Sequence, residues 1–471
     1  MSNNDPWVTM PETDPLKKKK AGLLVVALVS VLIVAVVLII ALQPRSKPEA
    51  SLVSQAQTEP ATPFSPDVPV APTAEPDVPV APTADPTPVV SAPDEPWVDG
   101  DWDWTLADGV LTIRGTGNVT RYPDFYTSAP WSSSSSDVIE LVVEEGITGI
   151  GGGTFYSLTN LRSASLPASL RNFEGSAFFG CRSLETIQVA EGSEYLLSVD
   201  GVLYSRDMKT ILCYPENKAG EQYRISNQVT SIGCYAFASS QNLRRLDIPG
   251  GVTEIQDYAF YCSQLTELAL PASVTRFGSC AFCGSCLTGL ELPADLTEIG
   301  DRAFLNCHSL ERIRIPSGVL SIGASAFSCC DKLPEIPVDA ANPNYVSVDG
   351  VLYTRDMKTL LCYPAGKEGG YYRIPDGVST IEYWAFGDCS NLTEVVIPFG
   401  VEYITRVFSG CRNLTAVHIP ESVTYIGYDT FFLCDKLTDV YYGGTQTSWS
   451  AINVDNSNDA LLTTTIHFNT N

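Results

Sequence analysis

Three cysteines, Cys280, Cys283 and Cys286, have the spacing that most strongly suggests a chemical role. A C-x₂-C-x₂-C run can bind a metal or an iron–sulfur cluster, but a structural zinc site or a cluster needs four ligands. The fourth would have to come from elsewhere in the chain, such as Cys262 or Cys307. Cysteine recurs at this point of a repeat, so we favour packing in the interior and expect no metal and no cofactor.

Histidine, the usual acid–base residue near neutral pH, is scarce in this chain. His308, His418 and His467 are the only three among 471 residues. No serine or cysteine stands beside any of them in a nucleophile-like motif. We therefore expect no enzyme and no catalytic residues. An enzyme whose site is assembled from separate coils is kept as a third function.

The charge balance excludes one class of partner. The chain has 29 Lys and Arg against 54 Asp and Glu, which gives a net charge of −25. Nucleic-acid binding depends on basic side chains that neutralise phosphates, so no nucleic-acid partner is expected. Charged residues are 18% of the chain and hydrophobic residues 44%, which is enough to bury a large core.

An uncharged apolar run at residues 21–42 predicts one transmembrane helix. A helix of that length spans about 33 Å, close to the hydrocarbon thickness of a bilayer. Four lysines at 17–20 precede the run and two basic residues follow it, which favours a cytoplasmic segment 1–20 and an extracellular remainder. The predicted location is the cell membrane, single-pass, through an uncleaved signal anchor. A removed signal peptide is the alternative.

A proline-rich linker is predicted for residues 43–97. Fourteen of the 32 prolines lie between residues 43 and 96, and PDVPVAPTAE at 66–75 is nearly repeated at 76–85. Proline lacks the backbone N–H that helices and sheets need, so we expect an extended, disordered stalk. Such a stalk would carry the remaining chain away from the membrane.

A short repeat, with a period of about 22 residues, governs the rest of the chain. It is marked by ten phenylalanines: Phe155, Phe178, Phe237, Phe260, Phe282, Phe304, Phe327, Phe386, Phe408 and Phe431. Two longer steps, Phe178 to Phe237 and Phe327 to Phe386, interrupt the period. Both contain nearly the same text, VDGVLYSRDMKTILCYP at 199–215 and VDGVLYTRDMKTLLCYP at 348–364. These copies are 149 residues apart, so a block of several repeats has been duplicated.

Each repeat predicts one coil of a solenoid. In the unit that starts at Leu392, the alternation of Leu392, Val395 and Ile397 indicates a short strand that ends at a proline. Val401 and Ile404 begin a second extended piece, and the repeat phenylalanine follows in a tight return. A single coil cannot bury its apolar side, so neighbouring coils must stack into a continuous core.

The predicted organisation has caps at both ends. Residues 98–137 form an N-terminal cap, and 138–436 form the solenoid, with two hairpin-like inserts at about 190–226 and 339–375. Residues 437–471 form a C-terminal cap that covers the last coil. Asp200, Asp207, Asp349 and Asp356 in the inserts are expected to serve hairpin turns rather than bind an ion.

The repeat text LTELALPASVTRFGSCAF at 265–282 and LERIRIPSGVLSIGASAFSCC at 310–330 resembles the BspA-like leucine-rich repeat family of bacterial and protist surface proteins. The resemblance covers about residues 98–471. It implies a leucine-rich-repeat solenoid of short parallel β-strands with loop or short helical returns. Members of the family serve as surface adhesins or have no assigned role, so the resemblance implies binding to a host matrix or cell-surface protein and brings no catalytic motif.

Six cysteines lie three residues after a repeat phenylalanine: Cys181, Cys307, Cys330, Cys389, Cys411 and Cys434. Side chains at one repeat position form a column along a solenoid. Buried thiols pack well and are commonly inert, so we expect a ladder of free thiols. Disulfides between coils are the alternative outside the cell.

The candidate binding residues are the outward side chains that alternate with buried ones on the first strand of each coil. They are Arg245, Asp247, Glu267, Glu291, Arg312, Arg314, Glu335, Glu394, His418, Asp439 and Tyr441. Stacked coils would align them into an extended face of the kind that solenoids use for partners. A solvated sheet face with no ligand is the simpler interpretation of each residue taken singly.

These observations favour a membrane-anchored, surface-displayed protein that binds another protein or a cell surface, without catalysis. The alternative is a structural scaffold of the cell envelope that binds wall polymer or neighbouring envelope proteins. The sequence does not identify the ligand or the oligomeric state.

Overall fold

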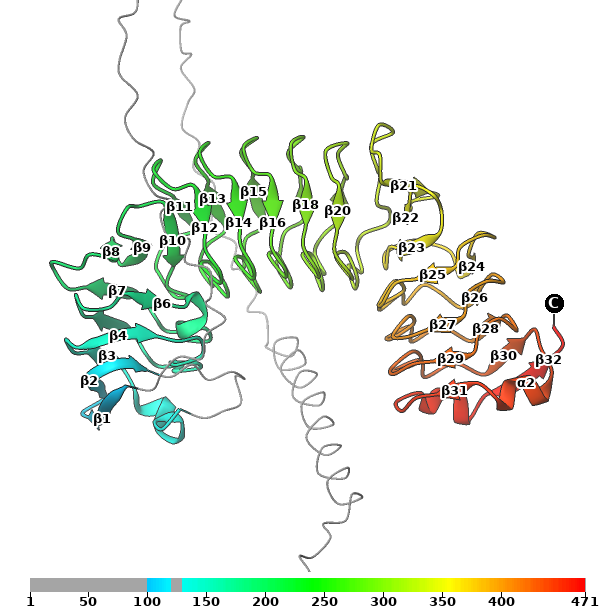
Figure 1. Cartoon of the computed structure of the whole chain (residues 1–471), viewed down its shortest axis with the longest axis horizontal. Coiled ribbons are helices and arrows are strands. Elements are labelled where there is room, and N and C mark those ends of the chain that lie inside the picture. The colour runs from blue at the N-terminus through cyan, green and yellow to red at the C-terminus, as the bar shows by residue number, and fades with distance from the viewer. Residues whose placement is uncertain (1–99, 120–128, 471) are drawn as a thin grey trace, which may run out of the picture. The chain divides into compact units, whose positions relative to one another are not determined.

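The computed structural model describes residues 100–119 and 129–470, which form a solenoid of short strands and turns (Figure 1). The expected transmembrane helix at 21–42 and the proline-rich stalk at 43–97 lie outside these residues. Within the described ranges, the helices are all too short or too polar to cross a bilayer.

Each coil contributes two short strands followed by a turn-rich return. In a representative coil, β15 (Glu267–Ala269) is followed by a proline-led turn and then by β16 (Arg276–Phe277). β15 pairs in parallel with β13 (Arg245–Asp247) of the preceding coil, and β16 with β14 (Glu254–Ile255). The coils are therefore joined by two separate rows of parallel strands.

The first row contains the strands that open each coil. Its members are β3 (Glu140–Val143), β5 (Ser163–Leu166), β7 (Thr186–Val189), β11 (Gln222–Arg224), β13, β15, β17 (Gly289–Leu290), β19 (Arg312–Ile313), β24 (Tyr371–Arg373), β26 (Glu394–Val396), β28 (Ala416–Ile419), β30 (Asp439–Tyr442) and β32 (Thr465–Phe468).

The second row contains the strands that follow the turn. Its members are β4 (Ile147–Ile150), β6 (Asn172–Phe173), β12 (Ser231–Ile232), β14, β16, β18 (Glu298–Ile299), β20 (Ser321–Ile322), β25 (Thr380–Ile381), β27 (Tyr403–Ile404), β29 (Tyr425–Ile426) and β31 (Asn453–Val454).

The two inserts fold as antiparallel three-stranded meanders. The first contains β8 (Leu196–Val199), β9 (Val202–Ser205) and β10 (Thr210–Cys213), and the second contains β21 (Tyr345–Val348), β22 (Val351–Thr354) and β23 (Thr359–Cys362). Asp200 and Gly201 join β8 to β9 with φ of 50° and 74°, the left-handed geometry that a tight hairpin turn requires. β10 then pairs in parallel with β12, so the insert continues the second row.

The repeat phenylalanines are buried and stack on one another, but in three runs rather than one. Trp131, Phe155 and Phe178 form the first run, with ring centroids 5.8 and 5.3 Å apart. The second run starts with Tyr214 beneath Phe237 at 5.2 Å and continues to Phe327; the third starts with Tyr363 and ends at Phe431.

The expectation of one continuous core is therefore wrong in this respect. The buried apolar residues divide into three clusters whose boundaries fall at the two inserts. The physical reason is that each insert supplies its own tyrosine, Tyr214 or Tyr363, as the ring on which the next phenylalanine rests. The preceding run ends at Phe178 or Phe327.

Both ends of the solenoid are covered. β1 (Asp101–Ala107) pairs antiparallel with β2 (Val110–Val119), and β2 pairs in parallel with both β3 and β4, so one long strand starts both rows. A 3₁₀ segment, Ser132–Asp137, leads into the first coil. At the other end, the short helix α2 (Gln446–Ser450) places Trp449 against Tyr442, with ring centroids 5.1 Å apart.

Candidate binding surfaces

Ten of the eleven predicted residues lie on strands of the first row or directly after them, and all eleven are exposed or half-buried. Seven belong to strands that other members of the row flank: Arg245 and Asp247 on β13, Glu267 on β15, Glu394 on β26, His418 on β28, and Asp439 and Tyr441 on β30. Arg312 opens β19, Arg314 and Glu291 directly follow β19 and β17, and Glu335 lies in the loop before the second insert.

In the central coils, these outward side chains pair with one another across neighbouring strands. Arg245 lies 3.0 Å from Glu267, Arg314 lies 3.3 Å from Asp339, and Asp247 accepts a hydrogen bond of 3.2 Å from the Nε of Arg224. Their side chains are largely exposed, so each pair contributes about 0–1 kcal/mol to stability. The pairs make this part of the face a mixture of both charges.

The Arg312 side chain has room on this face because a glycine lies opposite it in the neighbouring strand. Gly289 on β17 is its register partner, and a Cβ at Gly289 would lie 2.8–3.0 Å from the Arg312 side chain. The arginine therefore occupies the space that a side chain at position 289 would fill.

On the last coils, the outward face carries a stack of three rings. Tyr441 lies between His418 and His467, with both centroid distances at 4.6 Å and interplanar angles of 15° and 14°. Glu394 lies 3.0 Å from the Nε2 of His418. In the same arrangement two coils later, Asp439 lies 2.8 Å from the Nε2 of His467.

The hydrogen bond from His467, followed by that from Thr438, lowers the pKa of Asp439. His467 belongs to this face, although the sequence argument did not include it. The signal in the sequence is the alternation of Ile466 and Phe468 around His467, and in the structure β32 places His467 in register with Tyr441.

A second feature that the sequence argument missed is a group of four tyrosines on the second row of the C-terminal coils. We call it the tyrosine patch: Tyr383, Tyr403, Tyr425 and Tyr428. Tyr403 and Tyr425 are register partners on β27 and β29. Tyr383, Tyr403 and Tyr428 are 53%, 55% and 49% exposed, and the hydroxyl of Tyr425 donates a hydrogen bond to Asp455.

The duplicated block has different residues at these positions. Counting back 149 residues from the tyrosine patch gives Cys234, Glu254, Arg276 and Ser279. There, Arg276 forms ion pairs with Glu254 at 2.8 Å and with Glu298 at 3.0 Å. The ion-paired Glu254 and Arg276 on one block thus correspond to the rings of Tyr403 and Tyr425 on the other. Comparison of the two blocks position by position is the signal that would have found the patch.

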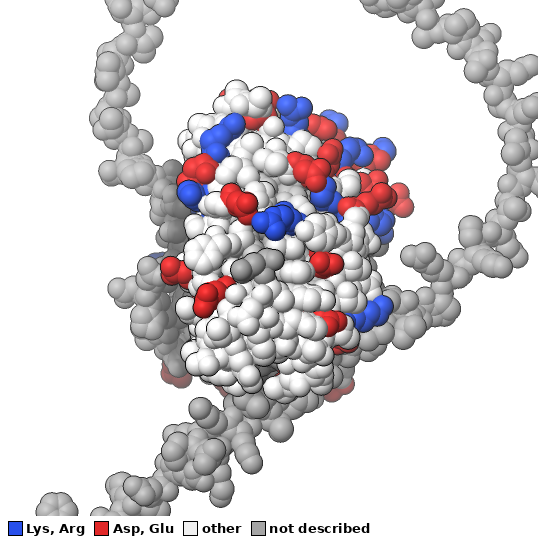
Figure 2. All heavy atoms as spheres, turned by 90° about the vertical axis from the view of Figure 1, so that its right-hand side faces the viewer, with Lys and Arg blue, Asp and Glu red and all other residues white. Residues whose placement is uncertain are grey.

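Charged side chains are unevenly distributed on this end of the molecule. Figure 2 looks from the side of the C-terminal coils, and it shows charged side chains of both signs gathered in the upper part of the face. The lower part carries few charged side chains.

The six ladder cysteines are buried, and five of them form the same kind of hydrogen bond. Each of these thiols donates to the carbonyl oxygen of the repeat phenylalanine in the coil before it, at 3.0–3.2 Å: Cys181 to Phe155, Cys307 to Phe282, Cys330 to Phe304, Cys411 to Phe386 and Cys434 to Phe408. Cys389 lies 3.7 Å from the carbonyl oxygen of Tyr363, the ring that opens its run. All fourteen cysteines are free thiols.

The C-x₂-C-x₂-C run lies within this packing. Cys280 and Cys283 are buried, and Cys286 is half-buried. The hydrogen bond from Cys283 lowers the pKa of Cys280 to about 7 and raises the pKa of Cys283. Among residues 100–119 and 129–470, histidine, cysteine and carboxylate side chains nowhere gather in threes with the geometry of a metal site.

Comparison with known proteins identifies the repeat. The family model for the BspA type leucine rich repeat region matches in six copies, over residues 132–198, 213–336 and 370–467. No curated protein matches this chain.

Among solved structures, a leucine rich cell surface protein from Faecalibacterium prausnitzii A2-165 is 24% identical to this chain, covering 78% of it and 99% of the other chain, with a TM-score of 0.39. A leucine-rich repeat protein from Bacteroides ovatus ATCC 8483 is 21% identical over 79% of this chain and 98% of the other, with a TM-score of 0.37. A leucine-rich repeat protein from Eubacterium ventriosum ATCC 27560 is 22% identical over 72% and 82%, with a TM-score of 0.33.

Proposed function

The chain belongs to the BspA-type leucine-rich repeat family, and on that premise we propose that it is a surface-displayed protein that binds an extracellular protein through the tyrosine patch. The hydrophobic run at 21–42 anchors the chain, and the proline-rich segment 43–97 carries the solenoid away from the membrane. The solenoid presents the binding residues on a rigid scaffold. The ligand is a matrix protein or a protein on another cell.

The single observation that carries this proposal is the exposure of the tyrosine rings. Burial cannot account for them, because three of the four rings are about half exposed or more. Folding does not require them either, because the duplicated block forms the same strands with Glu254 and Arg276 in place of Tyr403 and Tyr425. Tyrosine combines a large apolar ring with a hydroxyl, and it is enriched in the energetically important part of protein interfaces.

The solenoid geometry suits a ligand that contacts several coils at once. Strands of neighbouring coils lie about 4.8 Å apart, so the patch presents rings at the spacing of the backbone ladder. Because the strand register fixes the backbone beneath each ring, little conformational freedom is lost when a ligand binds. The outward first-row residues, including the ring stack around Tyr441, supply a second contact region on the same coils.

Catalysis is not part of the proposal. Leucine-rich repeats of this family are typically non-catalytic, and each histidine is already engaged by a carboxylate. His308 lies 2.8 Å from Asp331, and His418 and His467 have the partners described above.

The proposal is tested by measuring how the full-length chain, reconstituted in lipid vesicles, binds whole cells and immobilised matrix proteins. The variant combines Tyr383→Ser, Tyr403→Glu and Tyr428→Ser, in which the glutamate and the second serine follow the residues of the duplicated block. We expect binding at least 10-fold weaker than that of the wild type with an unchanged melting temperature.

A matched control removes an exposed tyrosine elsewhere. Tyr195 is 44% exposed on the first insert, and its counterpart 149 residues later is Asn344. The Tyr195→Asn variant is expected to bind as the wild type does. Equal binding by the triple variant and the wild type, or binding only to isolated cell wall, would contradict the proposal.

A further inference from the structure

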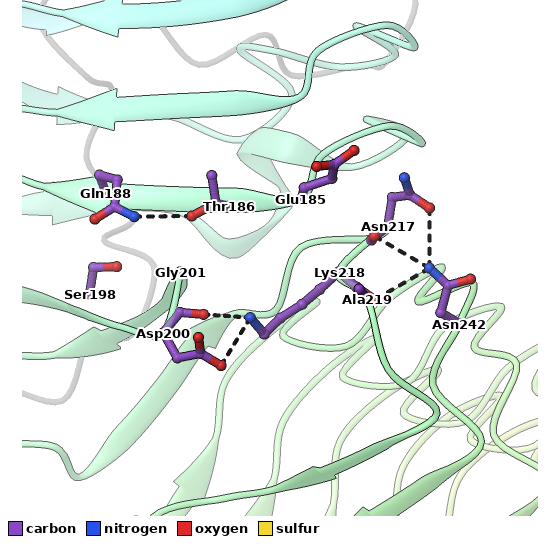
Figure 3. A pocket seen from close by; sticks show the side chains of 10 residues that line it. All are labelled: Glu185, Thr186, Gln188, Ser198, Asp200, Gly201, Asn217, Lys218, Ala219 and Asn242. Atoms are coloured by element: carbon purple, nitrogen blue, oxygen red, sulfur yellow. Dashed lines mark hydrogen bonds and ion pairs between the residues drawn. The ribbon is translucent and has the colours of Figure 1, made fainter.

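A polar hollow of about 680 Å³ opens between the first insert and the coil that contains β7 (Figure 3). This volume falls in the range of about 300–1,000 Å³ that is typical of small-ligand sites. Ten residues line it: Glu185, Thr186, Gln188, Ser198, Asp200, Gly201, Asn217, Lys218, Ala219 and Asn242.

One ion pair joins the turn between β8 and β9 to the segment that follows β10. The Nζ of Lys218 lies 3.1 Å from a carboxylate oxygen of Asp200 and also donates to the backbone carbonyl of that residue. The second insert has the same clamp, because Lys367 lies 3.2 Å from Asp349. The two lysine side chains are 14% and 17% exposed. The clamp therefore belongs to the fold of the insert in both copies.

The remaining wall residues differ between the copies. Counting 149 residues onward, Glu185, Thr186, Gln188 and Asn217 become Pro334, Glu335, Pro337 and Gly366. The second insert forms the same three strands with these replacements. The polar wall of the first insert is consequently not needed to build the insert.

The wall side chains have hydrogen-bonding capacity to spare. Gln188 donates its amide to the hydroxyl oxygen of Thr186 at 3.1 Å, which leaves the Thr186 O–H and the Gln188 Oε1 for a ligand. Across the hollow, Asn242 donates to the backbone and side-chain oxygens of Asn217 at 3.3 and 3.2 Å. That contact leaves the Asn242 Oδ1 and the Asn217 amide N–H groups. In the described part of the chain, these atoms have no other hydrogen-bond partner.

The charge of the hollow indicates the charge of its ligand. Lys218 and Asp200 neutralise each other, and Glu185 adds one exposed carboxylate at the rim. An anionic ligand would be repelled by that carboxylate. A hydroxyl group both donates and accepts, so a ligand with several hydroxyl groups matches walls that carry three amide groups and the Thr186 hydroxyl.

We propose that the hollow beside the first insert binds a short, neutral glycan. Thr186 and Gln188 hydrogen-bond its hydroxyl groups from one side, and Asn217 and Asn242 do so from the other. The Lys218–Asp200 clamp fixes the distance between the two sides. This inference does not depend on the tyrosine patch, which lies on the coils that follow the second insert.

The test is a titration of the full-length chain with maltotriose, cellotriose and tri-N-acetylchitotriose, followed by calorimetry and saturation-transfer NMR. A zwitterionic detergent is used, because maltoside detergents carry the same chemistry as the probes. At least one probe is expected to bind saturably. The double variant Thr186→Glu and Asn217→Gly, which introduces the residues of the second insert, is expected to bind that probe at least 10-fold more weakly.

A matched control makes the converse change beside the second insert. Pro337→Gln alters the position that corresponds to Gln188 and is expected to leave probe binding unchanged. The proposal is overturned if none of the three neutral probes binds at 10 mM, or if a sulfated disaccharide binds more tightly than all of them. Equal probe binding by the double variant and the wild type also overturns it. Circular dichroism of the double variant shows that a loss of binding does not come from unfolding.

Discussion

The thiol of Cys307 donates a hydrogen bond to the backbone carbonyl oxygen of Phe282, 3.1 Å away in the preceding coil. The same bond recurs with Cys330 and Phe304 one coil later. One repeat position therefore packs a small side chain into the interior and at the same time satisfies a backbone acceptor of its neighbour. These thiols are buried and act as hydrogen-bond donors, so we expect them to react slowly with alkylating reagents.

Most of the buried thiols should resist alkylation in the folded chain, and Cys280, whose pKa is lowered to about 7, is the exception. Burial raises the pKa of Cys213 and of Cys362 to about 12, and it also raises the pKa of Cys181. Because the thiolate is the reactive form, iodoacetamide at pH 8 should modify few of the fourteen cysteines in folded protein and all of them in denaturant. Mass spectrometry without reductant measures this. Masses two units lower per cysteine pair would show disulfides and contradict the prediction.

Replacing a repeat phenylalanine should destabilise the solenoid strongly. Phe304 is fully buried, and its ring stacks on Phe282 at 5.1 Å and on Phe327 at 5.4 Å. Phe304→Ala should lower the free energy of unfolding by about 3–5 kcal/mol, the usual range for a buried aromatic ring. Urea denaturation measures this, with Phe399→Ala as the control because Phe399 is 77% exposed. A loss below about 1 kcal/mol for Phe304→Ala would mean that the ring stack does not support the core.

Glu216 should make stability depend on pH. Its side chain is 5% exposed, one carboxyl oxygen accepts a bond from the Gly180 N–H, and the other has no partner among the described residues. Burial raises its pKa from 4.5 to about 8. The folded chain therefore keeps a proton that the unfolded chain releases, so stability is lost as the pH rises from about 4.5 to about 8. A pKa difference of one between the folded and unfolded chains corresponds to about 1.4 kcal/mol.

The second insert supplies the variant that tests this effect. Ala365 occupies the position that corresponds to Glu216. The free energy of unfolding of Glu216→Ala should fall less between pH 5 and pH 8 than that of the wild type, and the variant should be the more stable protein at pH 8. Parallel stability curves for the two proteins would show that Glu216 does not titrate in this range.

Reversing the charge of two outward arginines should affect binding without affecting folding. Arg312 lies over Gly289, and Arg314 forms only one exposed ion pair among the described residues, with Asp339. The double variant Arg312→Glu and Arg314→Glu should change the free energy of unfolding by less than about 1 kcal/mol. Its binding to cells should weaken by a smaller factor than that of the tyrosine variant, because it lies on the first row. Unchanged binding would show that Arg312 and Arg314 do not belong to the binding interface.

The coil repeat could be predicted from the sequence because the same residue types fill equivalent positions of the core in every coil. Each repeat has a phenylalanine at the same place, preceded by alternating apolar residues. Such coils bury their apolar side only when they stack on similar coils. The interruption of the ring stack was not predictable from that spacing. The longer step from Phe178 to Phe237 indicates an insert, but it does not show that Tyr214 takes the place of a ring beneath Phe237.

The contacts between outward side chains could not be predicted from the sequence alone, because they depend on the register between neighbouring strands. Alternation placed Glu394 and His418 outside, but their hydrogen bond joins residues two places apart in register, since Val396 is the partner of His418. The tyrosine patch was missed for a different reason. Tyrosine is intermediate between core and surface residues, so its type alone does not tell whether it is exposed, and only comparison of the two copies of the block distinguishes these positions.

The central claim, that the tyrosine patch is where a protein ligand binds, is tested most directly by hydroxyl-radical footprinting of the chain with and without bound ligand. Tyr383, Tyr403 and Tyr428 should lose most of their labelling when ligand is bound, while Tyr195 on the first insert should be labelled equally in both states. Protection of Tyr195, or of the coils that contain Glu254 and Arg276, with undiminished labelling of the three patch tyrosines would contradict the account.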